Sequence, residues 1–343
     1  PAQYRGGLNI CFQLLITIGV LIANLVNYGV LSLPPYGWRI SLGGAALPAL
    51  ILLLGSLAIV ETPTSLMEQG KEKDALRTLK QVRGVDNVED EFSEIFAAVE
   101  SAKQVKNPFR KVMSKNGPQL VCAILLQVFQ QLTGISVIML YSPVLFQTMG
   151  FKDNASILSA LLTNTIKPLS TIVAILLVDR FGRRALLIEA AFQMFIAMSS
   201  MGGILSAELH TSNVLAKSYA VTVIILISVF LAGFAWSWGP LAWLIPSETF
   251  PIETRPAGYF FAVSTNMLCT FVVAQTFLTM LCHMRAGIFF FYAASLFVMA
   301  IFAIVFLPET KGVPIDEMNE RVWKKHWFWK IFFPDERTMS TAA

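Results

Sequence analysis

The stretch LLQVFQQLTGISVIMLYSP, residues 125–143, indicates the fold class of this chain. It is apolar enough to form most of a membrane span, yet it carries the primary amides Gln127, Gln130 and Gln131. With Gly134 they follow the i, i+3, i+4, i+7 spacing of one helix face. An amide left unpaired in hydrocarbon is costly, so these side chains must bond neighbouring helices or face a wet cavity. Adjacent amides cannot both meet the same neighbouring helix, which favours the cavity.

The composition extends this interpretation to the whole chain. Hydrophobic residues make up 55% of the 343 residues and charged residues 14%, whereas a soluble domain has about 25% charged residues. A soluble protein would need many consecutive, wholly buried helices. The sequence therefore predicts an all-α polytopic membrane protein. Eight transmembrane helices are expected, at 8–31, 40–60, 118–146, 155–178, 185–206, 218–246, 257–282 and 286–307.

The sequence gives no indication of an enzyme, a cofactor or a metal site. The four cysteines form no CxxC pair and the three histidines are scattered. Cys11, Cys122 and Cys269 lie inside spans and are expected to be small core residues. Cys282 lies at the outer end of the seventh span. The chemistry of the chain is therefore expected on the polar faces of its spans.

The lysines and arginines predict the orientation in the membrane. Most of the 26 lie in alternate connections, above all in residues 71–115 and 311–337. Because cytosolic loops carry the positive excess, residues 62–117 and both termini are expected in the cytosol. The formal net charge of +4 reflects this bias and does not imply nucleic-acid binding.

Polar side chains also follow faces of three other spans. They are Gln13, Thr17, Asn24 and Asn27 in the first span, Ser156, Ser159, Thr163, Lys167 and Ser170 in the fourth, and Asn266 in the seventh. Uncharged amides and hydroxyls suit a neutral, polyhydroxylated ligand better than an ion. Interhelical hydrogen bonding is the alternative for any single amide.

Prolines interrupt the helices beside these faces. Gly239, Pro240 and Pro246 fall within the stretch WSWGPLAWLIP, and Pro168 is expected to break the fourth span. Broken helices near the midplane mark the binding sites of transporters. Trp243 lies in the interrupted helix and is the candidate for stacking on the C–H face of a sugar. A packing or interfacial position is the alternative.

Charges of both signs cluster at the expected cytosolic helix ends, in DRFGRR (179–184), PSETFPIETRPAG (246–258) and PETKG (308–312). Such charges can form interhelical salt bridges that must break for an inner gate to open. The positive-inside bias alone would account for isolated arginines. Glu61, Glu189 and Glu248 all lie towards cytosolic ends, so a proton-coupling acid is expected outside this sequence.

The longest interruption, 62–117, separates two spans from six. Its apolar residues recur at helical spacing among charges. They are Val88, Phe92, Ile95, Phe96 and Val99. The pattern predicts amphipathic cytosolic helices lying against the membrane domain, with a solvated linker helix as the alternative.

The motifs DRFGRR, PETKG, QQLTGISVIMLYSPVLF and ETPTSL resemble those of the sugar porter family of the major facilitator superfamily. GFAWSWGPLAWLIPSETFP and FLTMLCHM look most like plant monosaccharide/proton symporters. The resemblance implies a partial major facilitator fold in a 2 + 6 arrangement, an N-terminally truncated fragment with spans 5–12. The expected domains are 1–61, the last two spans of the N-terminal half; 62–117, a cytosolic helical linker; 118–307, the six-span C-terminal half; and 308–343, a cytosolic tail.

By the same resemblance, the function is membrane transport of monosaccharides, namely hexoses, with protons as the coupled partner, by alternating access in the plasma membrane. The substrate-binding positions are Gln13, Gln130, Gln131, Ser136, Lys167, Trp243 and Asn266, and the gating network is Arg5, Asp179, Arg183, Arg184, Glu248, Arg255 and Glu309. The coupling acid and its arginine belong to family spans 1 and 4, outside this chain. Cys282 matches a cysteine that pairs with an extracellular lid, which is also outside it.

Two positions depart from the family pattern. Ser136 replaces the asparagine of a TGIN motif, and Lys167 replaces an asparagine of the eighth family span. Lys167 places a cation where an amide would bind a sugar hydroxyl, so lower hexose affinity or flux is expected. A non-transporting sugar sensor, a facilitative sugar or polyol carrier and an inactive truncated gene copy are the alternatives to a symporter.

Overall fold

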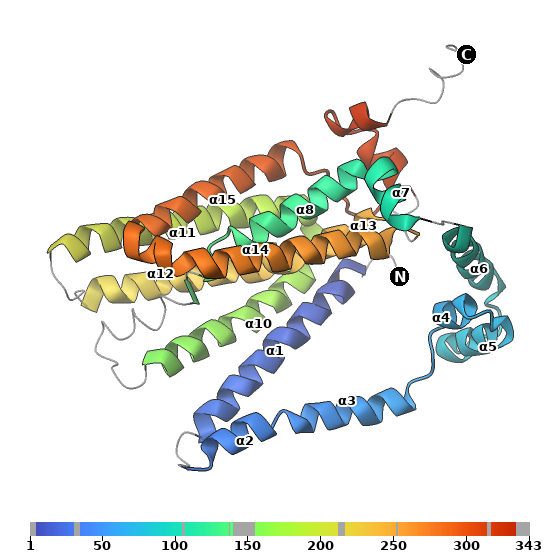
Figure 1. Ribbon diagram of the computed structural model, residues 1–343, viewed down its shortest axis with the longest axis horizontal. Helices are drawn as coiled ribbons and strands as arrows, with labels where there is room; N and C mark the ends of the chain where they lie inside the picture. Colours follow the sequence, from blue (N-terminus) through green and yellow to red (C-terminus); the bar gives the residue numbers. More distant parts are fainter. Residues whose placement is uncertain are drawn as a thin grey trace.

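Every regular element is helical in the part of the chain that the computed structural model describes, residues 5–30, 35–104, 107–136, 138–139, 155–211, 217–251, 253–313 and 317–333. Figure 1 shows an elongated bundle from which an N-terminal arm and a group of short helices extend. The bundle contains α8 (Gly117–Gln131), α10 (Ala155–Phe181), α11 (Arg183–Thr211), α12 (Lys217–Trp236), α13 (Trp238–Thr249), α14 (Arg255–Met284) and α15 (Gly287–Val305).

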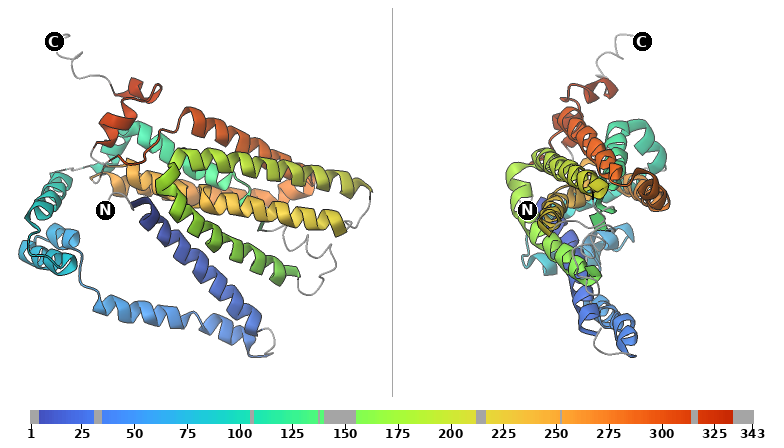
Figure 2. Two further views of the ribbon diagram at one scale, coloured as in Figure 1. Left: turned by 180° about the vertical axis from the view of Figure 1, so that it is seen from behind. Right: turned by 90° about the vertical axis from the view of Figure 1, so that its left-hand side faces the viewer.

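The N-terminal arm consists of α1 (Arg5–Val30), α2 (Gly37–Gly43) and α3 (Ala46–Ala58). The first of these helices packs along α10, and both views in Figure 2 keep the two together. The second and third turn back from its far end and have no buried residue, although α3 is almost wholly apolar. An apolar helix exposed on all sides requires lipid or another protein segment around it.

Seven helical stretches of the described residues are long and apolar enough to cross a membrane. They are Gly6–Val30, Gly37–Ala58, Ala160–Phe181, Arg183–Ala207, Ser218–Thr249, Arg255–Met284 and Gly287–Val305. These stretches match seven of the eight predicted spans. The remaining predicted span, 118–146, begins with α8, but most of its second half lies outside the described residues.

Helix α8 ends at Gln131, so the predicted continuous helix through Gly134 is wrong. Gly134 has a φ of +85°, which glycine adopts without the steric cost of a Cβ. A Cβ there would also lie 2.6 Å from the Met198 Cε and 2.8 Å from the Tyr292 Cγ. Gly134 therefore follows the end of α8 and does not continue the helix face that carries the glutamines.

The prolines act differently in two helices. The interruption predicted around Pro240 is present, because α12 and α13 are separated at Ser237, whose φ and ψ are −131° and −90°. The break predicted at Pro168 is wrong, since α10 continues through it. Thr171 Oγ1 donates to the Lys167 carbonyl at 2.8 Å, one turn along.

The linker forms α4 (Pro63–Glu68), α5 (Glu72–Arg83), α6 (Glu89–Gln104) and α7 (Pro108–Lys115). The predicted amphipathic helices are present. In the first three, however, the apolar faces pack on one another, with Leu66, Met67, Ala75 and Val99 at the centre. Figure 1 shows this group next to one end of the bundle, so these helices do not run along its long helices. Helix α7 instead contacts α8 and α14.

The main core lies where α11, α12, α13 and α15 meet, around Phe230, Trp238 and Tyr292. Beyond α15 follow a π-helical turn, η2 (Asn319–Trp323), and a 3₁₀ turn, η3 (Trp329–Phe332). Trp327 Nε1 donates to the Val305 carbonyl at 3.0 Å. This bond satisfies a carbonyl that the end of α15 leaves without a helical partner.

Candidate functional site

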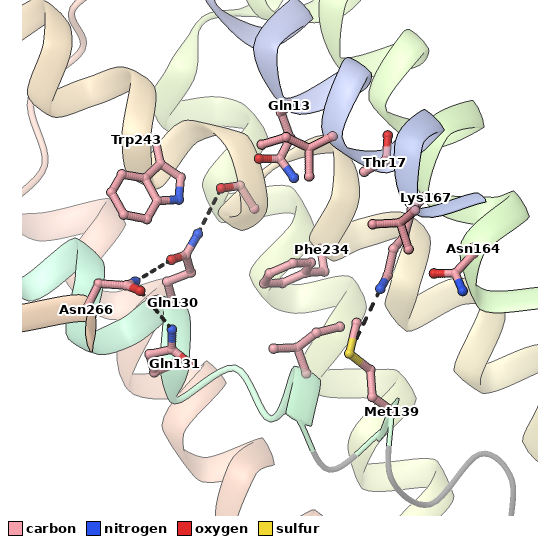
Figure 3. Close-up of a pocket in the computed structure, with 14 residues that line it drawn as sticks. Gln13, Thr17, Gln130, Gln131, Met139, Asn164, Lys167, Phe234, Trp243 and Asn266 are labelled. Atoms are coloured by element: carbon pink, nitrogen blue, oxygen red, sulfur yellow. Dashed lines mark hydrogen bonds between the residues drawn. The ribbon is translucent and has the colours of Figure 1, made fainter. Parts of the chain in front are cut away.

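A cavity of about 340 Å³ is lined by residues of α1, α8, α10, α12, α13 and α14. Its volume falls within the range of about 300–1,000 Å³ that is common for small-molecule sites. Figure 3 shows polar side chains on two opposite sides of it. We name these sides the amide wall (Gln130, Gln131, Trp243 and Asn266) and the open wall (Gln13, Thr17, Asn164 and Lys167).

The carboxamides of the amide wall bond one another between α8 and α14. Asn266 on α14 donates from Nδ2 to the Oε1 atoms of Gln127 and Gln130, each at 2.8 Å. Gln131 Nε2 donates to the Asn266 Oδ1 at 3.2 Å. The side chains of Gln127 and Gln130 are buried. Interhelical bonding and a cavity, the two explanations that the sequence left open, therefore both hold for this wall.

The interrupted helix α13 supplies the acceptors that complete this wall. Pro246 follows Ala242 by four residues and has no N–H, so the Ala242 carbonyl has no helical donor. Gln127 Nε2 donates to that carbonyl at 2.8 Å. Gln130 Nε2 donates to two carbonyls of the first turn of α13, at 2.8 and 3.2 Å. Pro246 thus leaves free the backbone acceptor that Gln127 occupies.

The open wall is built differently. Within the described part of the chain, the side-chain amides of Gln13 and Asn164 line the cavity without a protein hydrogen-bond partner. Lys167 Nζ lies 4.0 Å from the Met139 sulfur, a weak acceptor. Thr17 Oγ1 donates to the Leu14 carbonyl of its own helix at 2.9 Å. This wall therefore offers donors and acceptors to whatever occupies the cavity.

Trp243 stands between this cavity and a second one of about 240 Å³. Both cavities are lined by Gln13, Ile16 and Trp243. Tyr259 on α14 donates from its hydroxyl to the Trp243 carbonyl at 2.9 Å, which fixes the backbone at this position. The half-buried indole lines both cavities, and its stacking on a sugar stays a prediction.

Six of the seven predicted substrate-binding residues line the main cavity, namely Gln13, Gln130, Gln131, Lys167, Trp243 and Asn266. Ser136 is half-buried and does not line it, although the preceding Ile135 does. The polar stripe predicted for the fourth span is displaced, because Thr163 and Ser170 are buried elsewhere while Asn164 lines the cavity. The side chains of Ser156 and Ser159 lie outside the described residues.

Two asparagines of the predicted polar face of α1 do not line the cavity, and two residues that were not predicted do. Asn24 donates to the Val20 carbonyl of its own helix at 2.8 Å, and Asn27 accepts from Ser41 on α2. Neither asparagine lines the cavity. Phe234 was missed because it lies in an unbroken apolar run, whereas the side chain of Asn164 was detectable as a polar residue three positions before Lys167.

The predicted gating charges meet at one end of the bundle. Arg183 is paired bidentately with Glu248 on α13, at 2.8 and 3.1 Å, and both side chains are buried. Arg183 Nη2 also lies 3.0 Å from the Asp179 Oδ1. The Gly7 N–H of α1 donates to the other Asp179 oxygen at 2.9 Å. The network therefore ties α1 and α10, which bear the open wall, to α13, which helps to bear the amide wall.

Glu309 completes the network at the start of α11. Its carboxylate accepts the backbone N–H groups of Arg183 and Arg184 at 3.0 and 3.1 Å, which is favourable at a helix N-terminus. Gly182, with a φ of +94°, leaves room for that carboxylate, since a Cβ would lie 2.6 Å from it. The Arg184 guanidinium bonds carbonyls at the end of α15.

Two predicted gating residues remain. Arg255 is the first residue of α14. The side chain of Arg5 lies outside the described residues. Among the residues that the structure describes, no group of three His, Cys, Asp or Glu side chains could hold a metal ion. The arrangement is thus a cavity with polar side chains inside a helical membrane bundle, and buried ion pairs join three of its helices.

Comparison with known proteins assigns the chain to a family. Residues 1–322 match the family described as "Sugar (and other) transporter". Sugar transport protein 8 of Arabidopsis thaliana is 56% identical over 337 residues, which cover 98% of this chain and 66% of the relative. The chain therefore spans slightly less than two thirds of the length of that relative.

Solved structures agree on the fold. The proton:xylose symporter XylE bound to 6-bromo-6-deoxy-D-glucose superposes with a TM-score of 0.78 at 27% identity, covering 93% of this chain and 68% of that one. The inward-open conformation of XylE from E. coli gives a TM-score of 0.65 at 26% identity, covering 90% and 63%. The described helices are thus more similar to the sugar-bound conformation than to the inward-open one.

Proposed function

Because this chain belongs to the sugar (and other) transporter family, we propose that it carries monosaccharides across a membrane, with hexoses as the substrate class. The chain is a multi-pass membrane protein. The observation that supports a neutral polyhydroxylated substrate most directly is the cavity, with carboxamides from α1, α8, α10 and α14 and the Trp243 indole around it. Amides donate and accept at once, as sugar hydroxyls do.

The charged network supports alternating access as the mechanism. Arg183, Asp179 and Glu248 hold α1, α10 and α13 together at one end of the cavity. For the cavity to open at that end these ion pairs must part, and exposure of the charges to water would offset the lost contacts. The bundle would then open towards the side on which the network lies, which we place in the cytosol because of the lysine and arginine distribution.

Proton coupling is part of the proposal. The named neighbour XylE is a proton:xylose symporter. The acids of the described spans are Asp179, Glu189 and Glu248, and none lines the cavity. We propose that any coupling carboxylate is contributed from outside residues 1–343. Plasma-membrane location and cytosolic termini belong to the same proposal.

The function is tested with a protein completed to the length of its relatives by the remaining third of the Arabidopsis protein. In cells without hexose uptake of their own, the completed protein is expected to take up labelled glucose. Trp243→Ala is expected to weaken uptake affinity, because the ring would no longer stack on the sugar. Trp38→Ala, which removes an exposed tryptophan in α2 far from the cavity, is the matched control. No uptake by the completed protein, or unchanged affinity in Trp243→Ala at equal surface expression, would contradict the proposed site.

The orientation has its own test. Protease added to sealed, right-side-out vesicles should leave residues 62–117 intact, because that linker is expected in the cytosol. Permeabilised vesicles, in which the linker must be cut, provide the control. Cleavage of the linker in sealed vesicles would reverse the topology.

A further inference from the structure

Lys167 is the one charged side chain among the 14 residues drawn around the main cavity. It projects from the middle of α10, and its Nζ contacts the Met139 sulfur at 4.0 Å. No carboxylate of the described residues pairs with it. A cation that faces a cavity in a membrane domain is costly unless water or an anion compensates it.

The surrounding helices supply no compensating acid. The described helices α1, α8, α12 and α14 contain neither Asp nor Glu. On α10 itself the acid is Asp179, twelve residues and therefore about 18 Å further along the axis, and it is held by Arg183 and the Gly7 N–H. Glu248 is bound to the same arginine.

Side chains near Lys167 add further hydrogen-bond donors to this side of the cavity. Asn164 precedes it by three residues on the same helix face, and its amide lines the cavity without a partner among the described residues. Figure 3 shows Gln13 and Thr17 on this side of the cavity, opposite Asn266 and Gln131. On this side of the cavity, the Lys167 corner, an ammonium and carboxamides without partners among the described residues can donate hydrogen bonds to an oxyanion.

We propose that this corner is a carboxylate subsite, and that the cavity prefers monosaccharides bearing a carboxylate, the hexuronate class, over neutral hexoses. The inference rests on the proposed function and narrows its substrate class. The sugar ring lies against Trp243, where the Gln131 carbonyl oxygen can accept from a neutral hydroxyl. Its carboxylate meets Lys167, with Asn164 and Gln13 as additional donors. The same side chain, Lys167, is then expected to lower the affinity for neutral hexoses and to raise the affinity for hexuronates.

The test is equilibrium binding to the purified completed protein by titration calorimetry, with D-glucuronate and D-glucose as probes. At low salt, glucuronate is expected to bind about tenfold more tightly, equivalent to about 1.4 kcal/mol. High salt should reduce that ratio because ions screen the charge pair, and it should leave glucose binding unchanged. Lys167→Gln should abolish the advantage of glucuronate, whereas Lys167→Arg should retain most of it.

Lys103→Gln, which removes the same charge from an exposed position on α6, is the matched control and should preserve the ratio. Thermal melting of the helical signal verifies that each variant is folded, and Lys167→Arg tests the charge if Lys167→Gln does not fold. Glucose binding with no preference for glucuronate would overturn the carboxylate subsite alone. A preference that persists in Lys167→Gln would overturn it as well. Failure of both sugars to bind would overturn the proposed function too.

Discussion

The two walls of the cavity use the same chemical groups in opposite ways. In the amide wall, Asn266 bonds Gln127 and Gln130, and these glutamines bond backbone carbonyls of α13. In the open wall, Gln13 and Asn164 have no such partners among the described residues. One wall is therefore part of the scaffold that joins three helices. The other is available to a ligand.

A carboxamide in a membrane helix is therefore not by itself evidence for a binding group. A satisfied amide contributes to helix association, and its loss strands its partners. An unsatisfied amide beside a cavity contributes little to stability until a ligand arrives. The two roles predict different responses to substitution, so stability and binding measured on the same variants separate them.

The largest effect is expected where the two walls are joined. Arg183→Ala removes the buried partner of Glu248, and breaking a buried pair from one side costs about 3–5 kcal/mol. Chemical unfolding in detergent should show this loss in stability. Both walls should then separate, so sugar binding should fall as well.

The matched control is Arg83→Ala. Arg83 is bonded to Glu91 in the linker, with an Nε–Oε2 distance of 2.9 Å, but that pair is exposed. Water and ions screen an exposed pair, so this variant should unfold close to the unsubstituted chain. Equal losses in the two variants would mean that the buried network does not hold the helices together.

A smaller effect is expected within the amide wall. Asn266→Ala removes a donor from Gln127 and Gln130 and an acceptor from Gln131. Stranding these groups should cost about 1–3 kcal/mol of unfolding free energy. Asn24→Ala is the control, since Asn24 is half-buried and bonds a carbonyl of its own helix. A stability unchanged by Asn266→Ala would show that the wall is not a scaffold.

The open wall should respond in the reverse manner. Gln13→Ala and Asn164→Ala remove no hydrogen bond between described residues, so each should change stability by less than about 0.5 kcal/mol. Each should weaken sugar binding by about 0.5–1.5 kcal/mol, the value of a hydrogen bond in a partly wet site. Calorimetric titration and unfolding of the same preparations give both quantities. Instability without a binding defect would place these residues in the scaffold.

Much of this arrangement could be predicted from the sequence. The apolar blocks indicated seven spans that the described helices confirm, and the polar faces indicated Gln13, Gln130 and Asn266 as cavity residues. These predictions succeeded because the cost of a polar group in hydrocarbon is local and can be evaluated residue by residue.

What could not be predicted depends on the packing of other helices. The acceptor for Gln127 exists because Pro246 leaves the Ala242 carbonyl free on a different helix. Pro168 was expected to break α10, but one missing N–H is tolerated in a long helix packed on α1 and α12. By contrast, Gly239 and Pro240 follow a true break at Ser237, where the backbone leaves the helical conformation. Which amides are satisfied follows from such details.

The smallest effect on stability within the amide wall is expected at Gln131, which combines a scaffold bond with a position on the cavity. Gln131 lines the cavity, is half-buried, and makes a single 3.2 Å bond to Asn266. Gln131→Ala strands one acceptor only, and that acceptor faces a wet cavity in which water can replace the amide. Its stability loss should therefore be less than about 1 kcal/mol, below that of Asn266→Ala.

Its binding loss should resemble that of the open wall, because the Gln131 carbonyl oxygen has no protein donor among the described residues and is free to accept from a sugar hydroxyl. Gln131→Glu keeps acceptors at this position and supplies a second variant, in which the amide donor is replaced by a second carboxylate oxygen and a negative charge is added. Titration and unfolding of both variants place Gln131 between the two walls. If Gln131→Ala lowered stability as much as Asn266→Ala and left binding intact, the division between scaffold and ligand-binding amides would fail at its boundary.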